Sequence, residues 1–336
     1  DGRMCGPNPA LRDLVQDTIL YLSEADVAAL GIDRDRLREA IVAAFAAKAD
    51  GRSDVAVKST ILIAPGHLFQ AKPGILHDAG LAGMKWFGLV PTRAREGPSI
   101  TSTILVSAVR SGALLAIVGG DWITAQRTAA MSAIAARKLA RQASVRIGFV
   151  GAGVQGASHL HALPRVLPNL AHAVVCSRTE ASALRLADAA RAMGLTARVT
   201  SDPREAVEGM DVVVTTVPES APRLRFLDPN WVAPGAFVAA VDLARSWDHA
   251  KLAQFDLLAT DDREQTKALA AAGRMSYAGP YHADLADLCS GAAAGRTRDA
   301  QRAFFNFSGH ALADLAAAQI AIETAREKGI GVRLAR

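Results

Sequence analysis

A glycine-rich turn near the middle of the chain constrains the fold more than any other feature. Residues 151–156 read Gly-Ala-Gly-Val-Gln-Gly and directly follow the apolar run 145–150. Between a strand and a helix, the first glycine permits a tight turn, the second lets the backbone approach a pyrophosphate, and the third lets helix and strand pack closely. The pattern predicts a dinucleotide-binding Rossmann domain whose phosphate contacts include Gly151, Gly153, Val154, Gln155 and Gly156.

The chain beyond residue 145 alternates between short apolar runs and helical patterns. A helix is expected after the glycine turn and another at 180–193. Alternation of this kind is typical of a parallel, doubly wound sheet, so the fold class is α/β. The expected strands are 145–150, 173–176, 212–217, 237–241 and, as the last one, 257–260.

The preceding part of the chain has another pattern. Ser23 and Asp26 form a predicted capping box for a helix that ends at Gly31. β-type runs broken by glycine and proline favour antiparallel strands, and periodicity predicts three longer helices. The expected strands are 55–57, 59–63, 83–87, 99–109 and 114–118, and the expected longer helices are 33–48, 122–142 and 309–328. We therefore predict a domain of residues 1–143 with 310–336 and a Rossmann domain of residues 144–309.

Composition excludes several classes of function. The 38 basic and 33 acidic residues are spread along the chain, and aromatic residues make up only 5% of it, which argues against a nucleic-acid surface. No apolar run is long enough for a membrane span, and residues 1–17 lack the apolar core of a secretory signal. Three scattered cysteines, Cys5, Cys176 and Cys289, form neither a disulfide framework nor a metal site. A cytoplasmic protein that binds small molecules is expected.

The cofactor is read at the end of the second Rossmann strand. An acidic side chain there would hold the ribose hydroxyls of NAD, but this chain has Ser177, Arg178 and Thr179. An arginine flanked by hydroxyls suits a 2′-phosphate, so NADP is favoured and NAD is the alternative. A simple surface arginine is the competing interpretation of Arg178.

An ordered set of motifs resembles the ornithine cyclodeaminase/mu-crystallin family over nearly the whole chain. It comprises Gly83-Met-Lys85-Trp86, Thr124-Ala-Gln-Arg127-Thr128-Ala-Ala130, the glycine turn, Thr215-Thr216 with Pro218, Val241-Asp242, Asp261-Asp262 and Phe305-Asn-Phe-Ser-Gly309-His-Ala-Leu-Ala-Asp314. The resemblance implies an NAD(P)-binding Rossmann domain joined to an α/β domain that binds substrate and forms a homodimer. It also implies chemistry at the bond between an amino acid α-carbon and its nitrogen.

The resemblance assigns roles to individual residues. Lys85 matches the substrate lysine of the family, and its apolar strand would desolvate the amine and lower its pKa. A strand lysine that points to solvent is the alternative. Arg127 is expected to hold the substrate carboxylate and Asp242 to face the α-amino group. The expected cofactor contacts outside the glycine turn are Thr128, Ser177, Arg178, Thr179, Thr215, Val217 and Ser308.

Two departures from the cyclodeaminase pattern bear on the reaction. Lys58 stands where those enzymes carry an arginine, so we expect it to bind substrate as a single-point donor. Lys72 stands where they carry an acidic residue, in a run 68–73 that we expect to be a loop flanked by His67 and His77. The departures favour imine reduction or amino acid dehydrogenation. An ammonia-releasing lyase and a non-catalytic NADP-binding protein of the mu-crystallin type are the alternatives.

Overall fold

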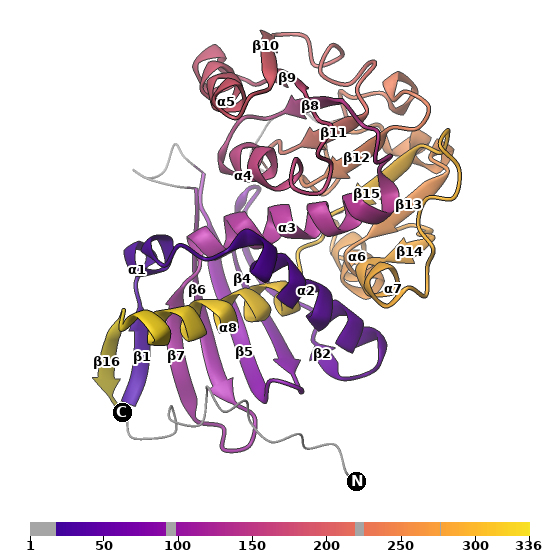
Figure 1. Ribbon diagram of the computed structural model, residues 1–336. Coiled ribbons are helices and arrows are strands. Elements are labelled where there is room, and N and C mark those ends of the chain that lie inside the picture. Colours follow the sequence, from indigo (N-terminus) through magenta and orange to yellow (C-terminus); the bar gives the residue numbers. More distant parts are fainter. Residues whose placement is uncertain (1–17, 92–98, 219–224, 276) are drawn as a thin grey trace. The chain divides into compact units, whose positions relative to one another are not determined.

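The structure is a computed structural model that describes residues 18–91, 99–218, 225–275 and 277–336 (Figure 1). Cys5 and the N-terminal segment 1–17, where no secretory signal is expected, lie outside the described residues. The chain divides into two units. Unit 1 consists of Asp1–Arg127 with His310–Arg336, and unit 2 consists of Thr128–Gly309.

Unit 2 contains an eight-stranded sheet in the order β10-β9-β8-β11-β12-β15-β13-β14. All the strand pairs described in this sheet are parallel, which confirms the predicted Rossmann sheet. β8 lies between the two halves, with β9 on one side and β11 on the other. The strands are β8 (Arg146–Val150), β9 (His172–Cys176), β10 (Thr196–Thr200), β11 (Val212–Thr215), β12 (Phe237–Ala240), β13 (Leu257–Thr260), β14 (Ala283–Asp284) and β15 (Ala303–Asn306).

The prediction that 257–260 is the last strand of this sheet is wrong. β14 and β15 follow it along the chain, and β15 is inserted between β12 and β13. Neither β15 nor β10 is among the strands expected from the sequence. β15 has four residues, all fully buried, which are too few to show a periodicity, and β10 is a polar strand at the edge of the sheet. The helices of unit 2 are α4 (Val154–Ala162), α5 (Glu180–Ala192), η3 (Pro229–Trp231), η4 (His249–Gln254), α6 (Arg263–Ala271) and α7 (Leu285–Ser290).

Unit 1 contains a second eight-stranded sheet, in the order β16-β1-β7-β6-β5-β4-β2, with β3 paired to β4. Its pairs are antiparallel, as predicted, except for the parallel pair β1–β7. The strands are β1 (Thr18–Leu22), β2 (Ser53–Val55), β3 (Ser59–Ala64), β4 (His67–Leu76), β5 (Leu81–Leu89), β6 (Ile100–Ala108), β7 (Leu114–Gly119) and β16 (Val332–Ala335).

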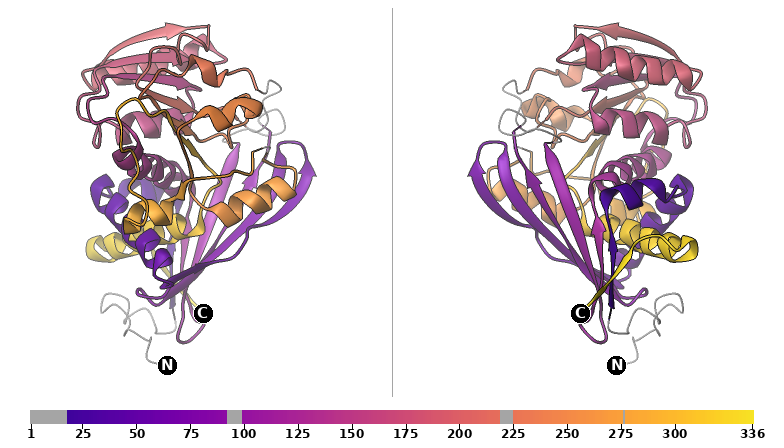
Figure 2. Two further views of the ribbon diagram at one scale, coloured as in Figure 1. Left: turned by 90° about the vertical axis from the view of Figure 1, so that its right-hand side faces the viewer. Right: turned by 90° about the vertical axis from the view of Figure 1, so that its left-hand side faces the viewer.

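Helices α2 (Arg34–Ala49) and α8 (Ala311–Lys328) cover one face of this sheet (Figures 1 and 2). A short helix, α1 (Glu24–Ala29), begins at the predicted capping box, in which the Ser23 and Asp26 side chains bond each other's backbone N–H groups. Helix α3 (Asp121–Leu139) contains the point at which the chain passes from unit 1 to unit 2. Among the described residues, no helix is long and apolar enough to cross a membrane.

The predicted loop at 68–73 is instead the middle of β4. This strand pairs with β3 on one side and with β5 on the other, and its residues alternate between buried and half-buried. Gln70, Lys72, Pro73 and Gly74 interrupt the apolar pattern by which a strand would be predicted. The two polar residues among them, Gln70 and Lys72, are buried in the structure.

Two glycines lie where α8 packs closely on this sheet. Gly74 and Gly83 are paired on β4 and β5. A Cβ at Gly83 would lie 2.5 Å from a methyl group of Leu315, and one at Gly74 would lie 3.3 Å from the Cβ of Ala311. The Cβ at Gly83 would also clash with the Leu105 carbonyl oxygen, so the backbone of β6 and the Leu315 side chain would both have to shift. The close approach brings α8 onto the strand that carries Lys85.

Candidate functional site

A buried cluster of charges lies between β5, α3 and α8 in unit 1. The ammonium group of Lys85 donates a hydrogen bond of 2.7 Å to Oδ1 of Asp314. The Nε atom of Arg127 lies 2.8 Å from the same oxygen. All three side chains are buried, with residue exposures of 3% or less. Lys85 therefore does not point to solvent. The Asp314 carboxylate contacts both Lys85 and Arg127, the two cations expected from the motifs to bind substrate.

Polar residues on neighbouring elements orient the lysine. Lys85 also donates to the hydroxyl of Thr124, at 3.2 Å, and that hydroxyl lies 3.2 Å from the Ser102 hydroxyl. The backbone N–H of Ser102 donates to Asp121 at the start of α3. The chain Lys85–Thr124–Ser102–Asp121 thus fixes the first turn of α3 against β5 and β6.

The charges of this cluster shift each other's titration. Burial lowers the pKa of Lys85 well below its ordinary value, and the positive charges of Arg127 and Lys72 act in the same direction against the opposing charge of Asp314. Burial acts to raise the pKa of Asp314, but the three cations outweigh it and the net shift is downward. Asp314 is therefore held as a carboxylate, and Lys85 gives up its proton more readily than an exposed lysine.

The two lysines at departures from the family pattern lie beside this cluster. Lys72 on β4 is paired directly with Lys85 on β5, and its side chain is buried. Lys58 directly precedes β3 and is buried as well. Because directly paired residues point to the same face of a sheet, Lys72 and Lys85 share the face that α8 covers.

The structure places the two histidines away from Lys85. His67 lies in β4 at an odd position, with its ring 6.3 Å from that of Phe69, and therefore on the opposite face of the sheet from Lys72. His77 follows β4, and its Nε2 lies 2.6 Å from a carboxylate oxygen of Asp54 at the surface. Neither histidine is brought to the cluster.

Asp242 is buried among polar side chains in unit 2, two residues beyond the carboxyl end of β12. Its Oδ1 accepts a hydrogen bond of 3.0 Å from the hydroxyl of Thr215, the last residue of β11. Its Oδ2 accepts from the hydroxyl of Ser246. The indole N–H of Trp247 donates to the Thr215 hydroxyl, at 3.3 Å. The Thr215 hydroxyl, predicted to contact the cofactor, is thus used to hold Asp242.

The backbone and the environment of Asp242 are both unusual. Leu243 and Ala244 have left-handed φ angles of 59° and 56°, which non-glycine residues seldom adopt and which often mark functional sites. Burial raises the pKa of Asp242 above the ordinary aspartate value, and the hydrogen bonds from Ser246 and Thr215 oppose this only in part. Such a carboxyl group takes up a proton more readily than an exposed aspartate.

The glycine turn has the geometry that a dinucleotide pyrophosphate needs. Gly151 has a φ of 106°, which only glycine adopts easily, and a Cβ at Gly156 would lie 2.8 Å from the Gly151 carbonyl oxygen. A Cβ at Gly153 would meet nothing within 4 Å, so space is open where α4 begins. No side chain caps α4, and its first turn has no acidic residue. These residues fit a bound pyrophosphate, which would accept hydrogen bonds from the free N–H groups.

The remaining predicted cofactor residues are spread over unit 2. Ser177 is half-buried and Arg178 and Thr179 are exposed, directly after β9, and Thr179 is the N-cap of α5. Ser308 follows β15, and its N–H and hydroxyl donate to Asp261 at 2.8 and 2.5 Å. In the same unit, Gln155 and Val217 are half-buried, Val154 is exposed, and Thr128 is buried on α3.

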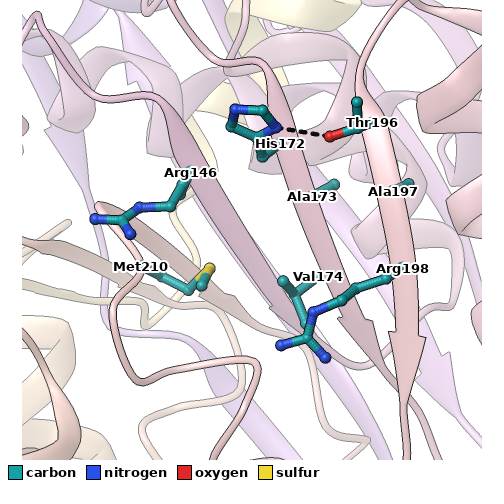
Figure 3. A pocket seen from close by; sticks show the side chains of 8 residues that line it. All are labelled: Arg146, His172, Ala173, Val174, Thr196, Ala197, Arg198 and Met210. Atoms are coloured by element: carbon teal, nitrogen blue, oxygen red, sulfur yellow. Dashed lines mark hydrogen bonds between the residues drawn. The ribbon is translucent and has the colours of Figure 1, made fainter.

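A cavity of about 360 Å³ lies elsewhere in unit 2 (Figure 3). Its lining includes Arg146, His172 and Thr196, which begin β8, β9 and β10, whereas the glycine turn follows the opposite end of β8. His172 bonds Thr196 at 2.6 Å, and Arg146 lies 3.8 Å from Asp211. Because ligands of open parallel sheets bind beyond the carboxyl ends of the strands, we do not assign this cavity to the cofactor.

Sequence reasoning did not assign roles to several residues that build these sites. Asp314 was only part of a motif, although an acidic residue inside an alanine-rich apolar helix is itself a signal of a buried partner. Ser246 was missed because its relation to Asp242 depends on the left-handed turn between them. Asp261 was recognised as a motif residue, but its part in holding Ser308 and Gly309 was not.

Comparison with known proteins agrees with the motifs. A model of the ornithine cyclodeaminase/mu-crystallin family matches residues 20–329. The alanine dehydrogenase of Archaeoglobus fulgidus is 28% identical over 324 residues, which cover 94% of this chain and 98% of that protein.

Two solved structures share the fold. Thermococcus litoralis Δ1-pyrroline-2-carboxylate reductase in complex with NADH and L-proline has a TM-score of 0.85 at 27% identity, over 94% of this chain and 100% of that one. An archaeal alanine dehydrogenase dimer with bound NAD has a TM-score of 0.84 at 27% identity, over 94% and 99% of the two chains. The chain belongs to the ornithine cyclodeaminase/mu-crystallin family, as its motifs imply.

Proposed function

We propose that the protein is an NAD(P)H-dependent oxidoreductase that acts on the CH–NH or C=N bond of an amino or imino acid. The observation that carries the proposal is Asp242, a buried carboxyl group held by two hydroxyls just beyond the carboxyl end of a strand in a dinucleotide-binding sheet. Ligands of such sheets bind at this edge. The names of the relatives, an alanine dehydrogenase and a pyrroline-2-carboxylate reductase, support the same class of reaction.

The side chains supply the binding and proton-transfer parts of this reaction. A bound dinucleotide would supply the hydride chemistry, with the α-carbon as hydride donor in one direction and the imine carbon as hydride acceptor in the other. Asp242 takes the proton from the amine in one direction and stabilises the positive iminium nitrogen in the other. Lys85 and Arg127 hold the substrate carboxylate, whose oxygens accept hydrogen bonds from their charged N–H groups. Lys58 adds a further cation to the binding site.

The position of Lys72 argues against the lyase alternative. Cyclodeaminases, by the family pattern, have an acidic residue there to activate the deaminating water. Here a buried lysine occupies the position and lies opposite Lys85 in the sheet. A lysine cannot supply the carboxylate that this step uses, so net oxidation or reduction is the expected reaction.

A substrate screen tests the proposal. NADPH and NADH oxidation would be followed with 2-oxo acids plus ammonia or methylamine and with cyclic imino acids. Stoichiometric cofactor oxidation with at least one of them is expected. Ammonia release from ornithine or lysine with only catalytic amounts of NAD would show a lyase instead. Tight NADPH binding without turnover of any compound would show a non-catalytic binding protein.

We expect NADPH to bind more tightly than NADH. Arg178 is exposed directly after β9, at the position where its guanidinium could hold a 2′-phosphate. Arg178→Asp should reverse the order of affinities in fluorescence titrations. Arg185→Asp makes the same charge change on the exposed side of α5 and should leave the order unaltered. Equal wild-type affinities for the two cofactors would contradict the assignment.

The sheet of unit 1 has an apolar face that α2 and α8 do not cover. On this outer face the rings of Phe69 and Trp86 stack 5.8 Å apart. Trp86 is 40% exposed, and Ile61 and Ile63 on β3 are 55% and 57% exposed. Apolar side chains gathered in this way usually mark an interface. We propose that a second copy of the chain covers them, consistent with the related alanine dehydrogenase dimer.

Sedimentation should therefore show a homodimer at micromolar concentration. Ile61→Lys and Trp86→Lys, which place charges on the outer face, should shift the protein toward monomer. Leu184→Lys is a matched control, because Leu184 is 42% exposed on α5 in unit 2. A wild-type protein that sediments as a monomer would exclude this interface.

A further inference from the structure

A second buried lysine accompanies the Lys85–Asp314–Arg127 cluster. Lys72 and Lys85 are directly paired between β4 and β5, and both ammonium groups lie over the ring of Phe87, 4.8 and 5.8 Å from its centroid. The residues are 7% and 2% exposed. Two ammonium groups are thus held side by side away from water, which is unfavourable unless negative charge at the site compensates them.

The row of cations extends to a third strand. Ser59, the first residue of β3, pairs with Ala71, so the chain just before β3 brings Lys58 next to the position of Lys72. Lys58 is therefore a third buried lysine close to the Lys72–Lys85 pair. Arg127 reaches the end of this row through Asp314.

We propose that Lys72 binds a second carboxylate of the substrate, which is therefore a dicarboxylic amino or imino acid. The inference rests on the proposed function, which assigns the first carboxylate to Lys85 and Arg127. Paired residues on neighbouring strands have Cα atoms about 5 Å apart. The carboxyl groups of a four-carbon dicarboxylate are separated by a similar length, so one short molecule can reach both lysines.

The charges of the cluster suit a dianion better than a monoanion. Asp314 interacts with Lys85, Arg127 and Lys72, and these four side chains together carry a formal charge of +2 when all are ionised. A monocarboxylate brings one negative charge to them, and a dicarboxylate brings two. Each carboxylate that reaches a buried ammonium forms a charge-assisted hydrogen bond, which is about twice as strong as a neutral one.

The wild-type protein provides the first test. Succinate and butyrate have the same number of carbons and differ in one carboxylate. In calorimetric titrations with saturating NADP⁺ or NAD⁺ at fixed ionic strength, succinate should bind at least about tenfold more tightly than butyrate. Equal affinities would overturn the proposal without recourse to any variant.

Variants then test whether Lys72 causes the preference for succinate. Lys72→Met keeps the length of the side chain and removes its charge, so the affinity for succinate should fall by about 10- to 100-fold and that for butyrate by less than about threefold. Lys72→Arg should keep most of the preference. Lys267→Met, on the exposed face of α6, is the matched control and should change neither affinity. An equal loss for both ligands in Lys72→Met would overturn the assignment.

The outcomes also separate this inference from the proposed function. A preference for succinate that depends on Lys72, without turnover of any amino or imino acid, would leave the second carboxylate subsite standing and contradict the proposed activity. Turnover of monocarboxylic imino acids with no preference for succinate would support the proposed activity and contradict the second carboxylate subsite.

Discussion

Asp242→Asn should lower turnover by at least about 100-fold while leaving cofactor affinity nearly unchanged. The amide has the shape of the carboxylate, and its oxygen can still accept from one of the Thr215 and Ser246 hydroxyls while its NH2 group donates to the other, but it carries no negative charge and accepts no proton. It can therefore neither stabilise an iminium nitrogen nor deprotonate an amine. Steady-state kinetics on the substrate identified by the screen, with fluorescence titration of the cofactor, would measure both effects.

The pH dependence gives the same prediction a second readout. Burial raises the pKa of Asp242, so the active carboxylate form should be lost as the pH falls through a value above that of an ordinary aspartate. The wild-type kcat/KM should decline on that acid side, and the Asn variant should lack the decline. Asp248→Asn removes a carboxylate at the start of η4 and should behave like wild type. Near wild-type turnover in Asp242→Asn would show that the residue is structural.

The Rossmann sheet could be predicted from sequence because its signals are local. The glycine turn lies between one strand and one helix, and β8, β11 and β12 are short runs in which nearly every side chain is buried. The members of each motif are close in sequence, so their spacing alone determines the geometry. The strand with Gln70, Lys72 and Pro73 was missed because its buried polar side chains contradict the apolar pattern on which strand prediction rests.

The charged cluster could be predicted only in part, because its members come from distant segments. Lys85 and Arg127 are found by motif, but Asp314 bonds Lys85 across 229 positions of sequence, and no local pattern records that contact. The glycine pair Gly74 and Gly83 explains the contact only after the register of β4 and β5 is known. Residue types at the site could thus be predicted from sequence, whereas their partners could not.

The same cluster predicts that stability and activity respond differently to two substitutions. Asp314→Asn removes the carboxylate that Lys85 and Arg127 share and leaves their charges buried without it. Removing one partner of a buried ion pair costs about 3–5 kcal/mol, so the free energy of unfolding should fall by that amount. Because the three cations hold the pKa of Asp314 below its ordinary value, this contribution is present at neutral pH and is lost as the pH falls through that lowered value.

Lys85→Met should lower the free energy of unfolding less than Asp314→Asn does, while strongly lowering turnover. It removes one of the cations that share Asp314, and Arg127 still lies 2.8 Å from the carboxylate, so the loss of unfolding free energy should be smaller than in Asp314→Asn. Turnover should nevertheless fall by at least about 100-fold, because the ammonium group that holds the substrate carboxylate is gone. Urea denaturation and steady-state kinetics of both variants, with Lys267→Met as control, measure the two effects. If Lys85→Met lost more stability than Asp314→Asn and kept its turnover, Lys85 would be a structural counter-ion of Asp314 and would not bind the substrate.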